Sequence, residues 1–144
     1  MGITNPAEVH FGKGLWGWLA STWVKLAALW GYSDRWNQNL SETCSAAGYV
    51  LKQTTAVPAG YVYVLEAVSM VLVNRAATWP SISLSDGATA VSLNASATLA
   101  ANTLFFWVGR VTLKEGDYVE LYLSGSQNGD TFTAGVWGYK MVIS

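Results

Sequence analysis

Side chains that could act as nucleophiles, bases or metal ligands are few in this sequence. His10 is the single histidine and Cys44 the single cysteine, and the two lie far apart along the chain. A Ser-His-Asp or Cys-His arrangement needs the histidine beside the nucleophile, and His10 precedes the strand-rich part of the chain. One cysteine forms no intrachain disulfide, and with one histidine it cannot supply four zinc ligands. The sequence therefore predicts neither nucleophilic catalysis nor a zinc site.

The carboxylates occur in turn sequences rather than in pairs suited to acid and base catalysis. Glu115 and Asp117 flank Gly116, and Asp86 and Asp130 lie beside glycines in similar stretches. Aspartates in turns normally bond neighbouring backbone amides and face water. The sequence has no calcium-loop, Walker or dinucleotide-binding glycine pattern. We expect a protein that is not an enzyme and that holds no cofactor or metal ion.

The composition restricts the partners as well as the class. Of 144 residues, 51% are hydrophobic and only 12% are charged, and the net charge is −1. Disordered chains are poor in hydrophobic residues, so the sequence predicts a folded chain with more buried surface than usual. The 8 lysines and arginines are spread along the chain without a cluster, which disfavours a nucleic-acid partner.

From about residue 49 onward the chain is rich in valine, threonine, serine and tyrosine. This pattern predicts an all-β body over residues 41–144, an antiparallel β-sandwich or jelly roll of about seven or eight strands. The expected strands are 49–57, 61–74, 81–85, 90–93, 103–113, 117–124 and 131–143. Turn residues at 58–60, 86–87, 115–117 and 125–130 separate most of them.

Alternation along two of these strands predicts which faces are buried. In 117–124, Val119, Leu121 and Leu123 share one face, and the residues between them suit a face that is in contact with water. In 61–73 both alternating sets are apolar, which predicts cover on both sides. A two-layer sandwich covers only one side. We therefore expect the N-terminal arm or a second subunit to cover the other side, and hence self-association.

Tryptophan is concentrated before this body, in an expected arm over residues 1–40. A step of three or four residues predicts a short Trp-rich helix with one apolar face, formed by Trp16, Leu19, Trp23, Leu26, Ala27 and Trp30. Each indole can bury roughly 150–250 Å² of surface, so the expected role of the arm is to anchor the protein to a partner. The residues expected to contact that partner are Trp16, Trp18, Trp23, Leu26, Trp30 and Trp36.

Three targets for the arm stay open from the sequence: its own sandwich, another subunit or a different protein, and a membrane surface. The membrane is the least favoured. Residues 15–32 carry one charge, Lys25, near the middle, where a spanning helix would bury it at a cost of several kcal/mol. The polar face of the helix also lacks the lysines and arginines typical of helices that lie on membranes.

The tryptophans of the body raise a rival interpretation, in which aromatic platforms bind sugar rings. Trp79, Trp107 and Trp137 lie among the expected strands, and Trp137 shares one face of the last strand with Tyr139. Packing in the core or in an interface is favoured over glycan binding for these rings. Trp137 and Tyr139 are therefore candidates for either a glycan contact or an oligomer contact.

Four short stretches combine turn and strand residues in an informative way: 29–35 (LWGYSDR), 56–64 (AVPAGYVYV), 114–117 (KEGD) and 134–139 (AGVWGY). Together they resemble small β-sandwich proteins of tailed-bacteriophage virions, over about residues 29–144. The resemblance implies a non-enzymatic structural protein without a cofactor, repeated on the virion surface and often trimeric. It implies a head-decoration, neck or tail-fibre-type module, which the arm would attach to a capsid, neck or tail protein. The alternative is a carbohydrate-binding host-attachment module.

Overall fold

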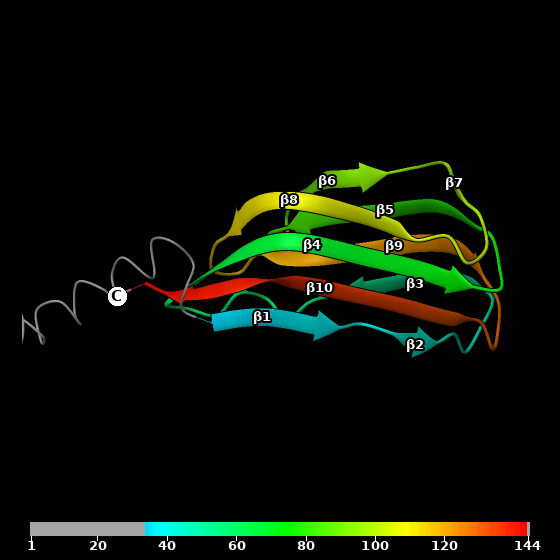
Figure 1. The fold of residues 1–144 in the computed structure, drawn as a ribbon, viewed down its shortest axis with the longest axis horizontal. Helices are drawn as coiled ribbons and strands as arrows, with labels where there is room; N and C mark the ends of the chain where they lie inside the picture. Colours follow the sequence, from blue (N-terminus) through cyan, green and yellow to red (C-terminus); the bar gives the residue numbers. More distant parts are fainter. Residues whose placement is uncertain (1–33, 144) are drawn as a thin grey trace, which may run out of the picture.

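The computed structural model describes residues 34–143, which form ten strands in two antiparallel sheets (Figure 1). The strands are β1 (Asp34–Asn39), β2 (Glu42–Thr43), β3 (Gly48–Gln53), β4 (Tyr61–Val73), β5 (Ala77–Ser85), β6 (Ala90–Ala95), β7 (Thr98–Leu99), β8 (Phe105–Leu113), β9 (Tyr118–Ser126) and β10 (Thr131–Val142). The all-β class expected from the sequence is confirmed. The strand count is higher than expected because β1 and the two-residue strands β2 and β7 lack a clear alternation. The expected arm helix lies outside the described residues.

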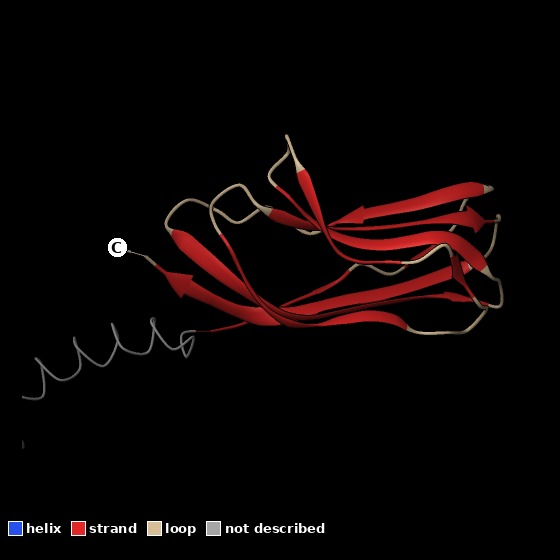
Figure 2. Ribbon diagram, turned by 90° about the horizontal axis from the view of Figure 1, so that it is seen from above, coloured by secondary structure: helices blue, strands red, loops and turns tan. Residues whose placement is uncertain are grey.

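Two sheets of five strands make the two layers of the fold (Figure 2). In sheet A the strand order is β1-β10-β4-β8, and β2 pairs with β10 beyond the end of β1. In sheet B the order is β3-β9-β5-β6, and β7 pairs with β5. This face-to-face arrangement is the sandwich that short strands with one apolar face are expected to form.

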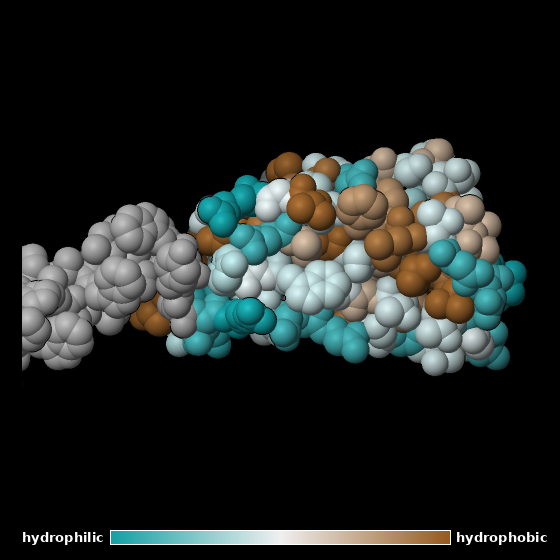
Figure 3. All heavy atoms as spheres, viewed as in Figure 1, coloured by the Kyte–Doolittle hydropathy of each residue, from teal (hydrophilic) through white to brown (hydrophobic). Residues whose placement is uncertain are grey.

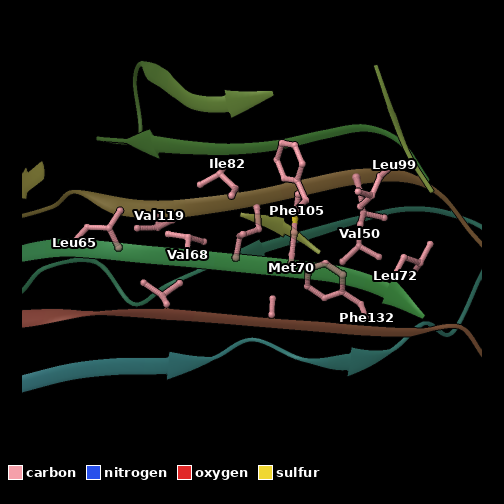
Figure 4. Packing of buried hydrophobic residues seen from close by; sticks show 14 of the residues in the cluster. Val50, Leu65, Val68, Met70, Leu72, Ile82, Leu99, Phe105, Val119 and Phe132 are labelled. Carbon is pink, nitrogen blue, oxygen red and sulfur yellow. The ribbon is translucent and has the colours of Figure 1, made fainter. Parts of the chain in front are cut away.

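The core lies between the two layers (Figure 4). Sheet B contributes Val119, Leu121 and Leu123, each with no exposed surface, so the alternation expected along this strand is confirmed. Sheet A contributes Met70 and Phe132, which are equally buried. Burying a side chain of this size stabilises the fold by roughly 1.5–3 kcal/mol, so these two facing rows are the main source of cohesion between the layers.

The turns have the chemistry that the sequence indicates. Gly87 (φ 86°) and Gly116 (φ 87°) adopt left-handed backbone conformations that favour glycine. Oδ1 of Asp86 accepts the backbone N–H groups of Ala88 and Thr89 at 2.9 and 2.7 Å. These turn carboxylates bond backbone amides next to them, as expected of aspartates in tight turns.

A bulge in β4 reverses the faces of that strand partway along it. Glu66 has no partner in the register with β10 or with β8, and both pairings shift at this point. Before the bulge Leu65 faces the core, and after it Val68 and Met70 do, so the core side changes from odd-numbered to even-numbered residues. This change of phase accounts for the two apolar sets seen in the sequence of this strand.

The folded body begins earlier than expected from the sequence. β1 starts at Asp34 and pairs with β10 over six residues, so 34–40 belong to the sandwich and not to the arm. Trp36 on this strand is only 6% exposed and lies 4.8 Å from the Tyr63 ring, centroid to centroid. The expectation that Trp36 anchors a partner is therefore corrected: its indole is part of the core, because β1 turns this residue inward.

Candidate functional site

The side of sheet A that faces away from sheet B is the candidate site, and we call it the outer face of sheet A. Register places Phe106 beside Ser69, and it places Val108 and Trp137 on either side of Ala67. Directly paired residues project to the same side of a sheet. These positions alternate with core residues on each strand, so all of them project outward.

The β8 side of this face is apolar and uncovered by any described residue. Val108 is 71% exposed and Phe106 53% exposed, and Leu104 just before β8 is also exposed. Half-buried valines of β4, among them Val71, continue the surface toward β10. In Figure 3 hydrophobic side chains form a band over β8 and β4 on this face. We call this part the apolar half.

The β1 side of the same face is a shallow groove with a polar rim, and we call it the Trp137 groove. Its walls come from β1, β4 and β10, and from Ser41, which follows β1. The side chains that line it include Asn37, Asn39, Ser41, Ser69, Thr133 and Trp137. The surface over β1 is hydrophilic in Figure 3, in contrast to the band over β8.

The Trp137 ring lies down along β10 instead of standing away from it. A Cβ atom added to Gly135 would lie 2.6 Å from Cη2 and 2.8 Å from Cζ2 of this ring. The indole therefore occupies the space that a side chain at position 135 would take, and Gly135 is buried beneath it. Trp137 itself is 46% exposed, so the other side of the ring is open to solvent.

The charges near this face are few and mostly paired. Nη2 of Arg110 donates to Oε1 of Glu66 at 3.0 Å, at the bulge in β4. Arg35 is exposed on β1, two residues from Asn37, and is not among the residues that line the groove. Within residues 34–143 no three histidine, cysteine or carboxylate side chains come together as metal ligands would. The face offers contacts and hydrogen bonds, and its described groups form no set suited to proton transfer.

The titratable groups with shifted pKa values lie outside this face. Burial raises the pKa of the Cys44 thiol, and the nearby Glu42 carboxylate acts in the same direction. The pKa of Asp86 is lowered by hydrogen bonds from the backbone of Thr89 and Ala88. Loss of solvation by itself raises the pKa of Asp130. Its hydrogen bonds with Arg75 and with the backbone of Gln127 have the larger combined effect, so the pKa is lowered. These shifts accompany packing and turn formation.

The sequence-predicted contact residues fall into three groups. Trp16, Trp18, Trp23, Leu26 and Trp30 lie outside the described residues. Trp36 is in the core, as described above. Trp137 and Tyr139 lie side by side on the outer face of sheet A, on the common face that their spacing predicts. Whether they bind a glycan or another copy of the chain stays a prediction.

The other tryptophans of the body occupy different surroundings. Trp79 is 65% exposed on sheet B with a positive φ of 53°. Trp107 is half-buried and packs against the core. The three rings predicted as platforms therefore lie on different sheets or sides, and they form no common platform.

Sequence reasoning missed Phe106, Val108, Asn37 and Asn39 as site residues. A signal for the first two exists, because both alternating sets of 105–108 (FFWV) are apolar, as they are in β4. No comparable signal marks the two asparagines. They border the groove because β1 pairs with β10, which lies about a hundred residues away in sequence and is a tertiary event.

Within the part of the chain that the structure describes, no helix has the length and apolar character needed to cross a membrane.

Comparison with known proteins gives weak structural likenesses. No family model and no curated protein matches the chain in sequence. The Drosophila NLP core, studied for pentamer formation and histone binding, is 12% identical with a TM-score of 0.35, over 76% of this chain and 99% of that one. An infectious bursal disease virus chain (Gx strain) is 9% identical with a TM-score of 0.37, over 74% of this chain and 32% of that one.

A CBM4 structure is also similar, with 10% identity and a TM-score of 0.28, over 74% of this chain and 83% of that one. The chain thus spans about a third of the viral protein and most of the other two. At TM-scores this low, the likenesses carry neither a fold family nor a function over to this protein.

Proposed function

We propose that this protein is a non-enzymatic structural protein of a tailed-phage virion. In this proposal it self-associates, as a trimer, through the apolar half of the outer face of sheet A. The residues before Asp34, with their four tryptophans and four leucines, attach it to a capsid, neck or tail protein. The virion assignment rests on the sequence resemblance, and the trimer rests on what that family is often found to form.

The observation that carries the proposal is the exposure of the apolar half. Full burial of Phe106 or Val108 would contribute up to roughly 1.5–3 kcal/mol of stabilisation each. A monomeric sandwich does not gain this stabilisation. Contiguous apolar surface of this kind is typical of protein contact sites. The competing class, a carbohydrate-binding host-attachment module, would use the polar side of the same face, and the two roles are compatible in one protein.

The test is deletion of residues 1–33, which ends before β1 so that Trp36 stays in the core. We expect the truncated chain to keep its strand-rich circular dichroism spectrum and its oligomeric mass by light scattering. Purified particles assembled with it should lack the protein, whereas particles assembled with the full chain should contain it. Normal decoration by the truncated chain would remove the anchor assignment. A monodisperse full-length monomer at micromolar concentration would remove self-association.

A further inference from the structure

We propose that the Trp137 groove binds a neutral pyranose residue of a polysaccharide, stacked on the indole ring. The groove lies on the β1 side of the outer face of sheet A, away from the apolar half. The inference therefore goes beyond the proposed assembly role and uses different residues. The glycan-binding inference does not depend on whether the assembly role is correct.

The indole lies over Gly135 and is partly exposed, which leaves it accessible for stacking. Its six-membered ring replaces a side chain on Gly135, so one side rests on β10 and the other faces solvent. The face of an aromatic ring carries partial negative charge. The C–H groups on one side of a pyranose ring are polarised by the ring oxygen and hydroxyls, so they are attracted to such a face. A ring that already lies in this position in the free protein loses less entropy when a ligand arrives.

The rim supplies hydrogen-bonding groups of the kind that sugar hydroxyls need. The side chains of Asn37, Ser69 and Thr133 have no hydrogen-bond partner within residues 34–143. Oδ1 of Asn39 accepts the Ser41 N–H at 2.9 Å, which leaves the Asn39 amide nitrogen with both donors. Amides and hydroxyls both donate and accept, as sugar hydroxyls do. A few such groups around an aromatic surface are characteristic of small-ligand sites.

Charge complementarity favours a neutral sugar over an acidic one. None of the side chains that line the groove is ionised at neutral pH. Glu66 and Arg110, at the β4 bulge, are engaged with each other. Carboxylate or phosphate groups of an acidic glycan would therefore find no cation among the lining residues, although their desolvation needs one.

A second copy of the chain is a poorer occupant of this groove than of the apolar half. A flat protein surface laid over Asn37, Asn39 and Thr133 would exclude water from groups that need partners, which costs about 1–3 kcal/mol for each group left unpaired. The apolar half has no such groups on its exposed valine and phenylalanine side chains. The outer face thus separates into one part suited to protein and one part suited to a hydrated ligand.

The experiment applies the full-length chain to an array of neutral and acidic polysaccharides and follows the hits by titration. We expect binding to at least one neutral polysaccharide. Trp137→Ala should weaken this binding at least tenfold, and the matched variant Trp79→Ala, which removes a more exposed indole from sheet B, should leave it unchanged. Gly135→Ala keeps the indole but displaces it from its seat, so it should also weaken binding. Light scattering should give the same oligomeric mass for all four proteins.

Four results would overturn the proposal. They are a chain that binds no neutral polysaccharide at millimolar sugar, binding confined to acidic polysaccharides, equal losses for Trp137→Ala and Trp79→Ala, and a changed oligomeric mass for Trp137→Ala. The last would assign the ring to a contact between copies. Each of these results leaves the test of particle attachment untouched, so the glycan site and the assembly role can fail separately.

Discussion

The outer faces of the two sheets differ sharply although the sheets are the same size. On the outer face of sheet B, serines on β5 pair with tyrosines and a glutamate on β9, some of these side chains form hydrogen bonds, and Leu51 on β3 is also exposed. Nε2 of Gln53 donates to Oε2 of Glu120 at 2.8 Å, and Oγ of Ser85 donates to Oη of Tyr118 at 3.2 Å. The outer face of sheet A carries valine, phenylalanine and tryptophan in the same positions relative to its core.

This contrast teaches that exposed apolar side chains are gathered mainly on one surface of the described residues. Sheet B has the polar outer surface of a sandwich that faces water, whereas sheet A has a second apolar surface behind its core side. The exposed aromatic side chains of sheet B include Trp79 and Tyr49, and Tyr49 stacks on Tyr122 with 5.8 Å between ring centroids. Sheet A is therefore the sheet through which we expect the protein to assemble.

The largest expected effect concerns Gly138 of β10, which lies very close to the backbone of β4. A Cβ atom at Gly138 would overlap the backbone oxygen of Val64 beside the β4 bulge. We expect Gly138→Ala to lower the free energy of unfolding by about 3 kcal/mol or more, because backbone must move. Gly135→Ala meets a side-chain ring that can swing away, so its loss in urea unfolding should be about 1 kcal/mol or less. Equal losses would contradict the tight pairing at the bulge.

A paired exchange of apolar residues tests the contrast directly. Phe106→Thr with Val108→Thr on sheet A should weaken self-association about a hundredfold, since two anchor side chains lose their buried area. Tyr49→Thr with Leu51→Thr on sheet B, also exposed positions, should change it less than about threefold. Sedimentation equilibrium over a dilution series measures both. A larger effect from the sheet B pair would reverse the assignment of the interface.

Two tyrosines provide a smaller test, on stability. Tyr118→Phe removes the acceptor of the Ser85 hydroxyl and should lower the free energy of unfolding by about 1 kcal/mol. Tyr139→Phe on sheet A removes a hydroxyl with no hydrogen-bond partner in the described part of the chain, so the change should stay under about 0.5 kcal/mol. Thermal or urea unfolding of the two variants should rank them in this order. The opposite ranking would show that the hydroxyl network of sheet B contributes nothing.

The smallest expected effect is on pH dependence in a turn. Backbone hydrogen bonds lower the pKa of Asp86, so its carboxylate stabilises the folded state at pH values above the unfolded pKa of about 3.9. That stabilisation is lost as the pH falls through the lower, folded-state pKa. Asp86→Asn should therefore differ from the natural chain at pH 6 and converge with it near pH 2, by unfolding at each pH. A difference that persists in acid would contradict this role, and self-association through the apolar half should not follow the same titration.

Much of the sandwich is predictable from the sequence because strand alternation and turn chemistry are local signals. Val119, Leu121 and Leu123 alternate with polar or tyrosine residues, and the structure buries all three. The turns at Gly87 and Gly116 need left-handed backbone conformations, which glycine supplies. In β4 the alternation gives two apolar sets and leaves open which one faces the core at each end.

The position of Trp36 shows where local signals fail. Its neighbours Asn37 and Asn39 give the segment little strand character, and the nearby tryptophans suggest continuity with the arm. Pairing with β10 makes this segment a strand, and the parity of that pairing turns Trp36 inward and Asn37 outward. The same pairing creates the Trp137 groove, whose rim has no signature in the sequence.

The sequence by itself indicated an all-β chain with few charged residues and more apolar residues than one core uses. Composition and alternation suffice for this, because burial follows from side-chain chemistry along each strand. Only the tertiary structure decided where the additional apolar side chains lie. The bulge at Glu66 changes which side of β4 faces inward, and the pairing of β1 with β10 sets the indole of Trp137 beside amides. Both depend on register between distant segments, which no local pattern records.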